Sequence, residues 1–390
     1  MKYSNKIIYT ILTLVITIIV FFLTSLTLLI IFPDEQVEQV LKTSIYFSIF
    51  VLFIISIIGA FLLKNGKKEY QENINLENIP PEFEKIYKEL YSSHISELEK
   101  ERKKLKFSTT VQNLSIILLC ISYGCIKFDE VITSEEVRSI IGVIFLISFI
   151  TAIVFCFKNV GYRKKYVGTY KDEIIGSFVK LVSPNLKYNK VISVELNAKE
   201  EYLMANFEDK RFNRFYDDDY ISGTIDENVH INMCDLHIQN VTGGGRNRHT
   251  EEIFQGLFCK TNCNKNINTV IKITRNKIKF LNNQNRIEMD SSEFEEYFDV
   301  YSENKILTMQ LLTSDVMETL IDFYKKYNLE FEIVFKNKNI YIRFFTGAMF
   351  EPKVFGSSMD KQLLFMYFTI LKFVLNVNRV VNKTLNEMEI

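Results

Sequence analysis

Three adjacent aspartates, Asp217, Asp218 and Asp219, precede Gly223 and carry the carboxylate oxygens that bind hard metal ions. An EF-hand loop separates its acidic ligands with other residues, in the pattern D-x-D-x-D-G. Neighbouring side chains of an extended chain point to opposite faces, so three adjacent carboxylates do not converge on one ion. We therefore interpret the triplet as a polar turn leading into a strand, with Gly223 where the backbone bends.

Zinc is the second chemistry that the residue types suggest, because zinc binds cysteine and histidine. The candidates are His230, Cys234, His237, Cys259 and Cys263. If 228–239 is a strand, positions 230 and 234 share a face and 237 points to the other. The two later cysteines also lack the common two-residue gap. We therefore expect no metal site, with the cysteines in the core and the histidines on the exposed face.

Other signatures of catalysis or cofactor binding are not matched. The stretch GGGRNRH at 243–249 lacks the GxxxxGK[ST] spacing of a phosphate loop and is interpreted as a hairpin tip. GxSxG does not occur, and the four histidines follow no recognisable triad order. The sequence therefore predicts no catalytic residue and no cofactor. Lys+Arg and Asp+Glu number 47 each, which does not indicate a nucleic-acid partner.

The apolar residues are concentrated in long uncharged runs. Each is long enough, or nearly so, to cross a hydrocarbon core about 30 Å thick as a helix. The first run is too long for a cleavable signal peptide and is not followed by a small-x-small cleavage site. The four predicted transmembrane helices are at about 7–32, 44–63, 107–126 and 139–157.

Basic clusters flank these spans on one side only. Lysine and arginine stay on the cytoplasmic side, whereas the segments joining the spans within each hairpin are mostly acidic. We expect a multi-pass protein of the cell membrane, with both termini, the 64–106 loop and everything after residue 158 in the cytoplasm. Ionisable groups are absent from the spans, and only Gln112 and Asn113 stand out, which disfavours an ion pathway.

The domain organisation follows from these spans. An N-terminal transmembrane hairpin (1–63) precedes a cytosolic helical loop (64–106) and a second hairpin (107–157). Pro80-Pro81 opens a helix in the loop, and its apolar periodicity runs without a breaker into the third span. A linker helix occupies 158–184. We expect it to pair with the helix of the 64–106 loop as a stalk, before a cytosolic α+β domain at 185–390.

Residues after 185 alternate between polar and apolar in short runs, which predicts strands. The runs include EIFQGLFCK, NTVIKIT, KIKFL and KILTMQLL, and KNKN at 336–339 predicts a hairpin. Helices are predicted at 314–328 and 359–387, the latter an amphipathic helix on the sheet because polar residues interrupt it too early for a span. The fold class is a membrane protein with four transmembrane helices plus a cytosolic α+β domain, mostly antiparallel sheet with flanking helices.

Several sequence motifs occur along the chain in an order similar to that of a known family. They include FNRFYDDDYISGTI, IFQGLFCKTNCNK (253–265), MDSSEFEEYFDVYSEN (289–304), MFEPKVF (349–355) and LNVNRVV (375–381). Over roughly residues 80–384 the chain resembles the bacterial family called domain of unknown function 3137. The resemblance implies a bacterial membrane protein with a cytosolic α+β domain. Residues 1–63 add two spans to the family's usual pattern, and the chain end lacks its tryptophan.

The recurrent family pieces are D-Y-I-x-G, F-x-G-L-F, S-x-E-F-E-x-x-F and F-E-P. No catalytic role is carried over with them, and we interpret them as structural: phenylalanines flank a close backbone approach at Gly256, and Ser291 or Ser292 can cap a short helix. The positions concerned are Asp219, Gly223, Phe254, Gly256, Phe258, Phe294, Phe298, Phe350, Glu351 and Pro352.

These observations favour a non-enzymatic binding or scaffold module at the membrane. Its expected partners are the lipid bilayer and either another protein or further copies of the chain. One alternative is a metal-dependent enzyme that uses the Asp217–Asp219 region on a membrane-linked or nucleotide substrate. A second alternative is a transport or channel component.

Overall fold

The computed structural model describes residues 79–127, 135–190, 197–207, 211–224, 229–276 and 285–388. The expected spans at 7–32 and 44–63 and the expected strand KIKFL lie outside them. The chain divides into two compact units. The helical unit contains residues 104–163 among those described, and the sheet unit contains 69–103 and 164–390.

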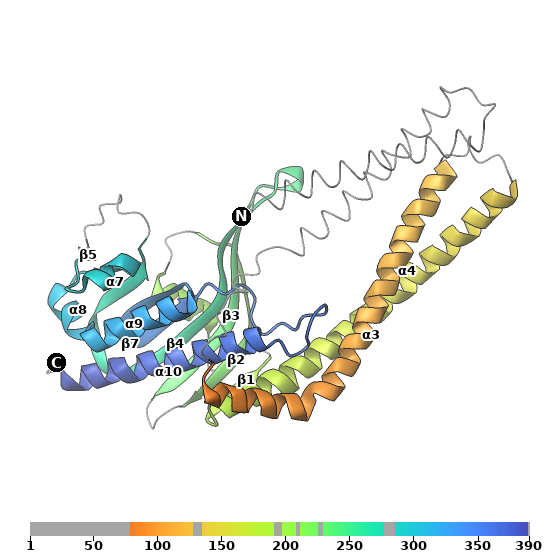
Figure 1. The fold of residues 1–390 in the computed structure, drawn as a ribbon. Helices are drawn as coiled ribbons and strands as arrows, with labels where there is room; N and C mark the ends of the chain where they lie inside the picture. Colours follow the sequence, from red (N-terminus) through yellow and green to blue (C-terminus); the bar gives the residue numbers. More distant parts are fainter. Residues whose placement is uncertain are drawn as a thin grey trace. The chain divides into compact units, whose positions relative to one another are not determined.

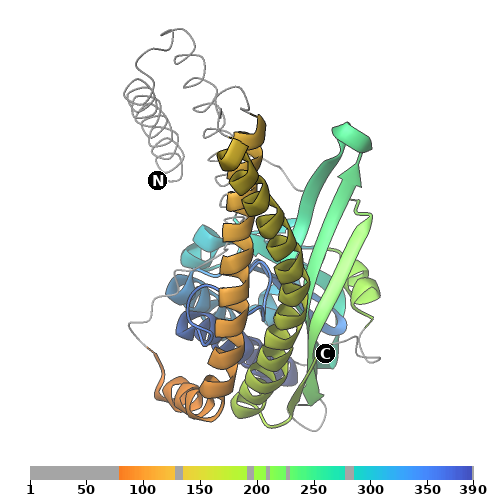
Figure 2. The same cartoon turned by 90° about the vertical axis from the view of Figure 1, so that its right-hand side faces the viewer.

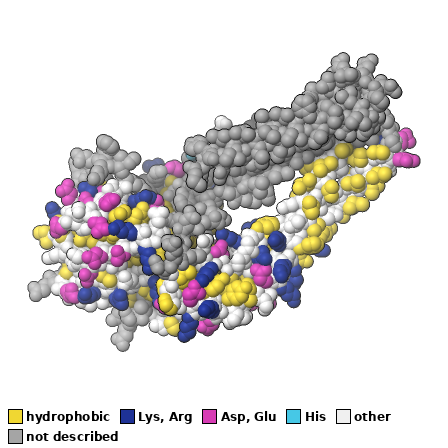
Figure 3. Space-filling model, viewed as in Figure 1, with side chains coloured by type: hydrophobic (Ala, Val, Ile, Leu, Met, Phe, Trp, Pro, Cys, Tyr) yellow, Lys and Arg dark blue, Asp and Glu magenta, His cyan; other side chains and the backbone are white. Residues whose placement is uncertain are grey.

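Two long helices run through the helical unit. α3 (Pro81–Lys127) is unbroken from Pro81 into the third expected span, as its periodicity predicts, and α4 is Glu135–Thr169. Their most apolar stretches are only 17% and 6% buried, and Figure 3 shows hydrophobic side chains gathered along both. Such apolar, outward-facing helices are long enough to cross a membrane.

An amide pair joins α3 and α4 within the helical unit, and serines line α3. Ser108, Ser115 and Ser122 recur every seven residues along α3 and are buried, and Ser115 and Ser122 donate to backbone carbonyls one turn earlier in α3. The Asn159 amide of α4 donates to the Gln112 side-chain oxygen of α3. Gln112 therefore holds two helices together, which accounts for one of the two polar residues noted in the third span.

The sheet unit is built on an antiparallel sheet in the order β1-β2-β3-β4-β6-β5, with β7 also paired to β4. Figure 2 shows its longest strands, drawn in green, lying side by side. This confirms the predicted antiparallel sheet. The strands are β1 (Leu186–Asn189), β2 (Arg214–Thr224), β3 (His230–Thr242), β4 (His249–Arg275), β5 (Arg286–Ile287), β6 (Phe298–Ser302) and β7 (Phe331–Phe344).

β4 and β7 differ from the prediction of several short strands. The predicted hairpin at 336–339 is wrong: β7 continues through it, because β4 offers a pairing partner along its whole length. The register between β4 and β7 shifts between Asn262 and Ile271 of β4. Opposite this shift, Asn337 of β7 has a left-handed φ of 56°. The predicted strand at 305–312 is also wrong. It forms α8 (Lys305–Leu311), whose first turn is capped by Asn304.

Helices cover both faces of this sheet. α6 (Ala198–Ala205) lies on one face, where Glu201 pairs with Lys260 of β4 at 2.5 Å. On the other face, Asn378 of α10 (Lys361–Glu387) donates to Thr261 of β4 at 2.7 Å. α9 (Ser314–Tyr327) runs beside α10, and α7 is Ser292–Tyr297 (Figure 1).

α10 meets the length and hydropathy criteria for a membrane span, but its most apolar stretch is 72% buried inside the protein. It is therefore the helix that covers the sheet, as predicted from its pattern. Its buried aromatic side chains include Phe373, which stacks on Phe323 of α9 at 3.8 Å between ring centroids. The helices at 314–328 and 359–387 are thus confirmed.

Gly256 marks a close backbone approach between β4 and the end of β7. Its φ is +153°, and a Cβ atom there would lie 1.9 Å from the carbonyl oxygen of Phe344. An L-amino acid with a side chain therefore fits neither the conformation nor the space. We predict that Gly256→Ala lowers the unfolding free energy of the full chain by about 3 kcal/mol or more.

Thermal unfolding in detergent, followed by circular dichroism, measures this effect. Gly161→Ala in α4 is the matched control, because nothing lies within 4 Å of a Cβ atom there. It should unfold at or slightly above the temperature of the unmodified chain, since alanine favours helix over glycine. Equal melting temperatures for both variants would contradict the close approach.

Candidate functional site

The residue at the centre of the candidate site is Lys171. α4 passes into a π-helical segment, η1 (Tyr170–Ile175), and then into α5 (Gly176–Val182). π-helical turns are rare and occur often at functional sites. The Lys171 ammonium is buried and lies 2.5 Å from Asp219, 2.7 Å from Glu351 and 3.5 Å from Asp218.

A β-bulge in β2 brings two neighbouring aspartates to this ammonium. Asp218 pairs with Asp235 of β3, but the next pair is Ile221 with Met233, so β2 contains one extra residue. Asp219 takes a left-handed φ of 55° inside the bulge. The triplet is therefore not a turn before a strand, and two of its three carboxylates converge because the bulge breaks the alternation. Asp217 instead accepts a hydrogen bond from the Tyr220 hydroxyl.

Glu351 comes from the chain between β7 and α10, which we call the 345–360 loop. The loop is fixed to the sheet unit at its start. The backbone N–H of Met349 donates to Asp235 Oδ2 at 2.9 Å, and that of Phe350 donates to the Tyr367 hydroxyl of α10 at 2.8 Å. Phe350 has a left-handed φ of 58°. The F-E-P motif is thus held in the conformation that presents Glu351 to Lys171.

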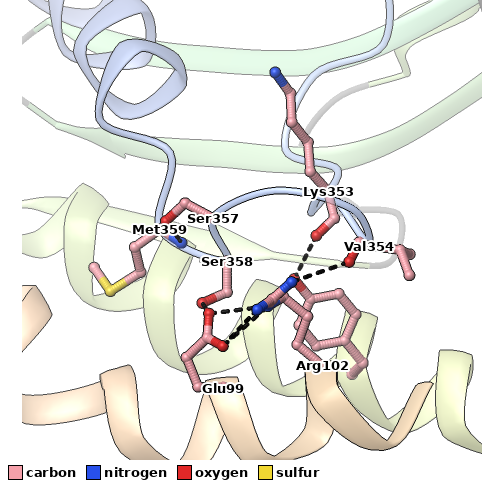
Figure 4. Close-up of polar contacts among 8 residues, drawn as sticks. Glu99, Arg102, Lys353, Val354, Ser357, Ser358 and Met359 are labelled. Carbon is pink, nitrogen blue, oxygen red and sulfur yellow. Dashed lines mark hydrogen bonds and ion pairs between the residues drawn. The ribbon is translucent and has the colours of Figure 1, made fainter. Parts of the chain in front are cut away.

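The same loop is bonded farther on to the N-terminal half of α3 and to the C-terminal end of α4 (Figure 4). The Tyr166 hydroxyl donates to the Lys353 carbonyl at 2.9 Å. Arg102 donates to the Val354 carbonyl at 3.3 Å and chelates Glu99. Glu99 in turn accepts from the Ser358 hydroxyl at 2.5 Å. The loop therefore connects the carboxylate cluster to both helices.

These parts of α3 and α4, with η1 after α4, also contact each other, as expected for a stalk. Lys165 of α4 pairs with Glu101 of α3 at 3.0 Å. His94 of α3 lies 3.6 Å from Glu173 of η1. The stalk, the 345–360 loop and the edge of the sheet thus meet around Lys171 within the sheet unit.

An open hollow of about 310 Å³ adjoins the cluster. Its walls are formed by β2, β3, one residue of β4 and the 345–360 loop. Tyr216 lies opposite His237, and Asp218 lies opposite Asp235, so these four side chains share one face. The lining residues are Tyr216, Asp217, Asp218, Asp235, Leu236, His237, Gln255, Ala348 and Glu351.

Asp235 is the most unusual group of the hollow. Its side chain is 8% exposed. Oδ2 accepts from Met349, whereas Oδ1 is buried and has no hydrogen-bond partner among the residues that the structure describes. Burial raises the pKa of Asp235 well above its usual range, with the nearby charge of Asp218 acting in the same direction.

Burial also raises the pKa of Asp219 to about 6, although hydrogen bonds from Lys171 and Tyr188 act to lower it. For Lys171, burial acts to lower the pKa, but the hydrogen bonds to Asp219 and Glu351 outweigh it and raise the pKa. The ammonium therefore stays charged, and the cluster holds more carboxylates than its one cation neutralises.

A metal could in principle be held by these carboxylates. One oxygen each from Asp218, Asp219 and Glu351 lies within 4.8 Å of the others. Carboxylate oxygens suit Mg²⁺, Ca²⁺ and Mn²⁺. However, the Lys171 ammonium stands among the same three groups. A metal ion would bind there only if Lys171 moved away.

The cysteines and histidines considered for zinc have other roles in the structure. Cys234, Cys259 and Cys263 are buried, and burial raises the thiol pKa of each. His230 contacts Thr224, and His237 contacts Gln239 and lies 3.7 Å from Glu252. Buried thiols of raised pKa are poor nucleophiles and poor ligands.

The family-motif residues separate into two groups. Asp219 and Glu351 bind Lys171. The others pack: Gly223 lies against the Asn185 backbone, Phe254 and Phe258 surround Tyr202 of α6, and Phe294 and Phe298 contact each other. Ser291 caps α7, as predicted, but Phe298 already begins β6.

Sequence reasoning missed Lys171, Tyr188 and Asp235. A signal existed for Lys171, because it lies on the same helical face as the apolar Ile174, Ile175 and Phe178, where a lysine needs a partner. No comparable signal marks Asp235, whose position opposite Asp218 depends on strand register.

Comparisons with known proteins agree with the resemblance. The family described as "Protein of unknown function (DUF3137)" matches residues 252–383, which confirms the resemblance over that segment. The search of curated proteins found no match. One solved structure, the mycobacterial trehalose monomycolate transport factor A, TtfA, is 10% identical, with a TM-score of 0.31. That alignment covers 55% of this chain and 94% of that one.

The raised pKa of Asp219 predicts a specific pH dependence of stability. Between about pH 4 and 6 the folded chain keeps a proton that the unfolded chain has released, so stability falls as pH rises through this window. One such group contributes a slope of at most about 1.4 kcal/mol per pH unit. Asp219→Asn should remove this contribution, and asparagine tolerates the left-handed φ.

Chemical denaturation of both proteins at intervals across that range provides the measurement. The decisive quantity is the difference between the two proteins in the slope of unfolding free energy against pH. Asp235 contributes to this slope in the same direction in both proteins. Parallel pH profiles for the two proteins would show that Asp219 does not retain a proton in the folded chain.

Proposed function

We propose that this chain is a multi-pass protein of the cell membrane whose α+β domain is a non-enzymatic binding module on the cytoplasmic side. The observation that carries the proposal is the 345–360 loop. The loop supplies Glu351 and the Met349 N–H to the hollow region, and it is bonded to Tyr166 and Arg102. A ligand in the hollow would therefore act on a segment attached to α4 and α3.

The pairing of the charged and hydroxyl groups in the site supports ligand binding rather than catalysis. Lys171 is neutralised by carboxylates, and the hydroxyls of Tyr188 and Tyr220 donate to Asp219 and Asp217. Nucleophilic catalysis needs a group activated by a neighbouring base or by a lowered pKa. The tyrosines have raised pKa values through burial and these hydrogen bonds, which is the opposite condition.

The apolar helices and the flanking charges support the location. Lysines and arginines follow the apolar run of α4 and precede that of α3, as expected for cytoplasmic ends. The bilayer is thus one partner. A second protein or another copy of the chain is the other partner we propose, and the balanced charge favours either over a nucleic acid.

A metal-dependent enzyme is the second candidate, favoured by the three converging carboxylates of Asp218, Asp219 and Glu351. It would act on a membrane-linked or nucleotide substrate, with Lys171 displaced by the ion. Titration of the full chain with Mn²⁺ separates the candidates. The enzyme hypothesis requires Mn²⁺ binding that Asp218→Asn weakens. Mn²⁺ binding that this substitution leaves unchanged would contradict the hypothesis.

Surface labelling of intact cells tests the predicted orientation. A membrane-impermeant thiol reagent added outside should not modify Thr250→Cys, at an exposed position of β4, until the cells are opened. Thr133→Cys, between the third and fourth expected spans, should react without opening the cells. Native Cys234, Cys259 and Cys263 are buried and give little background. Labelling of Thr250→Cys from outside would place the domain on the other side of the membrane.

Native mass spectrometry of the full chain, purified in mild detergent from its own host's membranes, tests the binding module itself. We expect a fraction of the chain to carry a small molecule, a lipid or a protein, and Asp218→Asn to reduce that fraction. Asp218 is 54% exposed, so its replacement should leave folding intact.

Asp315→Asn is the matched control for that experiment. Asp315 is 66% exposed and pairs with Lys383 on the α9–α10 side of the sheet unit. The control should keep the bound fraction of the unmodified chain. If every protein, unmodified or variant, were recovered only as a bare monomer, the proposal of a binding module would be wrong.

A further inference from the structure

The charge balance of the hollow indicates the class of ligand. The carboxylates of Asp218, Asp235 and Glu351 line it, and Asp219 lies directly behind them at Lys171. Four carboxyl groups thus adjoin one ammonium; the raised pKa of Asp235 favours its protonated form, so the negative charge rests chiefly on Asp218, Asp219 and Glu351. Clefts lined by one sign of charge concentrate ligands of the opposite sign. The hollow should therefore attract a cation.

Asp235 adds a second, independent indication. Its Oδ1 is buried without a partner among the described residues, although the side chain belongs to the wall of the hollow. Leaving a buried acceptor without a donor costs about 1–3 kcal/mol. A cationic N–H donor that reached this oxygen would supply the missing hydrogen bond and favour the ionised carboxylate, whereas a ligand with acceptors alone would favour the protonated form.

Lys171 shows which cationic group this environment accommodates. Its ammonium lies 2.5 and 2.7 Å from two carboxylates, at and below the short end of the range for charge-assisted N–H···O hydrogen bonds. A metal ion would have to displace this ammonium. An ammonium group placed in the hollow would instead use Asp218, Asp235 and Glu351 from their open side and leave Lys171 in place.

The remaining lining suits the carbon chain of such a ligand. Tyr216 is 51% exposed and its ring lies 6.1 Å from that of His237. Aromatic faces attract alkylammonium groups and cover methylene groups. The volume of about 310 Å³ is at the lower end for small-molecule sites, which fits a ligand of a few carbons.

We propose that the hollow binds a small organic cation through its primary ammonium group, with Asp218, Asp235 and Glu351 as acceptors and Tyr216 against its carbon chain. This inference rests on the proposed function and names the ligand class of the same site.

Calorimetric titration of the full chain in detergent tests it, with cadaverine and spermidine as probes and pentanediol as the neutral analogue. We expect saturable binding of the amines and none of the diol. Asp235→Asn should weaken amine binding about tenfold or more, because a bound cation favours the ionised form of Asp235, which asparagine cannot supply.

Asp172→Asn is the matched charge control. Asp172 follows Lys171 on η1, is 64% exposed and pairs with Lys190 rather than lining the hollow. Its replacement should leave amine binding unchanged. A similar loss in Asp172→Asn and Asp235→Asn would mean that the amines bind only to surface charge, which overturns the proposal.

Two further results would also overturn it. One is the absence of amine binding at millimolar concentrations, and the other is binding of Mg²⁺ or Ca²⁺ in place of the amines. If the native spectra still showed a bound species lost in Asp218→Asn, only the ligand class would be rejected. A bare chain in those spectra would reject the binding module as well.

Discussion

The burial of one ammonium group is the constraint on which the junction of helices and sheet depends. Lys171 is only 7% exposed, and an unpaired charge at such depth is too costly to persist. Its carboxylate partners come from β2 and from the 345–360 loop, so neither can move away without leaving charges uncompensated. Breaking a buried ion pair typically costs 3–5 kcal/mol. This energy fixes three segments that are far apart in sequence.

Unusual backbone geometry surrounds this one group. The π-helical turn carries Lys171, and the left-handed residues Asp219 and Phe350 lie at or beside its two closest partners. Left-handed conformations of residues other than glycine cost of order 1–3 kcal/mol each and persist where the surroundings compensate for them. Here the compensation is visible as the ion pairs and the hydrogen bond from the Phe350 N–H to Tyr367. The distortions are therefore part of how the cluster is assembled.

The sequence predicts those parts of the fold that rest on local periodicity. The unbroken helix from Pro81, the helix beginning at Ser314 and the covering helix from Lys361 all follow from apolar spacing. It fails where pairing partners decide the outcome. KNKN forms no turn because β4 runs past it, and Asp218 meets Asp235 only through a register that a one-residue bulge then changes. The alternation rule that separated Asp218 from Asp219 was sound for a regular strand but not for this one.

The segment that matches the family of unknown function supplies only part of the charged cluster around Lys171. Residues 252–383 contain most of β4, β7, Glu351 and nearly all of α10, yet Lys171 and Asp219 precede that segment. The matched segment therefore contributes Glu351 and the loop, while the stalk contributes the cation and β2 and β3 contribute the other carboxyl groups. The loop also accepts hydrogen bonds from Arg102 and Tyr166. One short stretch of backbone therefore connects the charged groups of the hollow to the two stalk helices. A change in charge at the hollow thus has a direct physical route to the stalk, through Glu351 and the carbonyls of Lys353 and Val354.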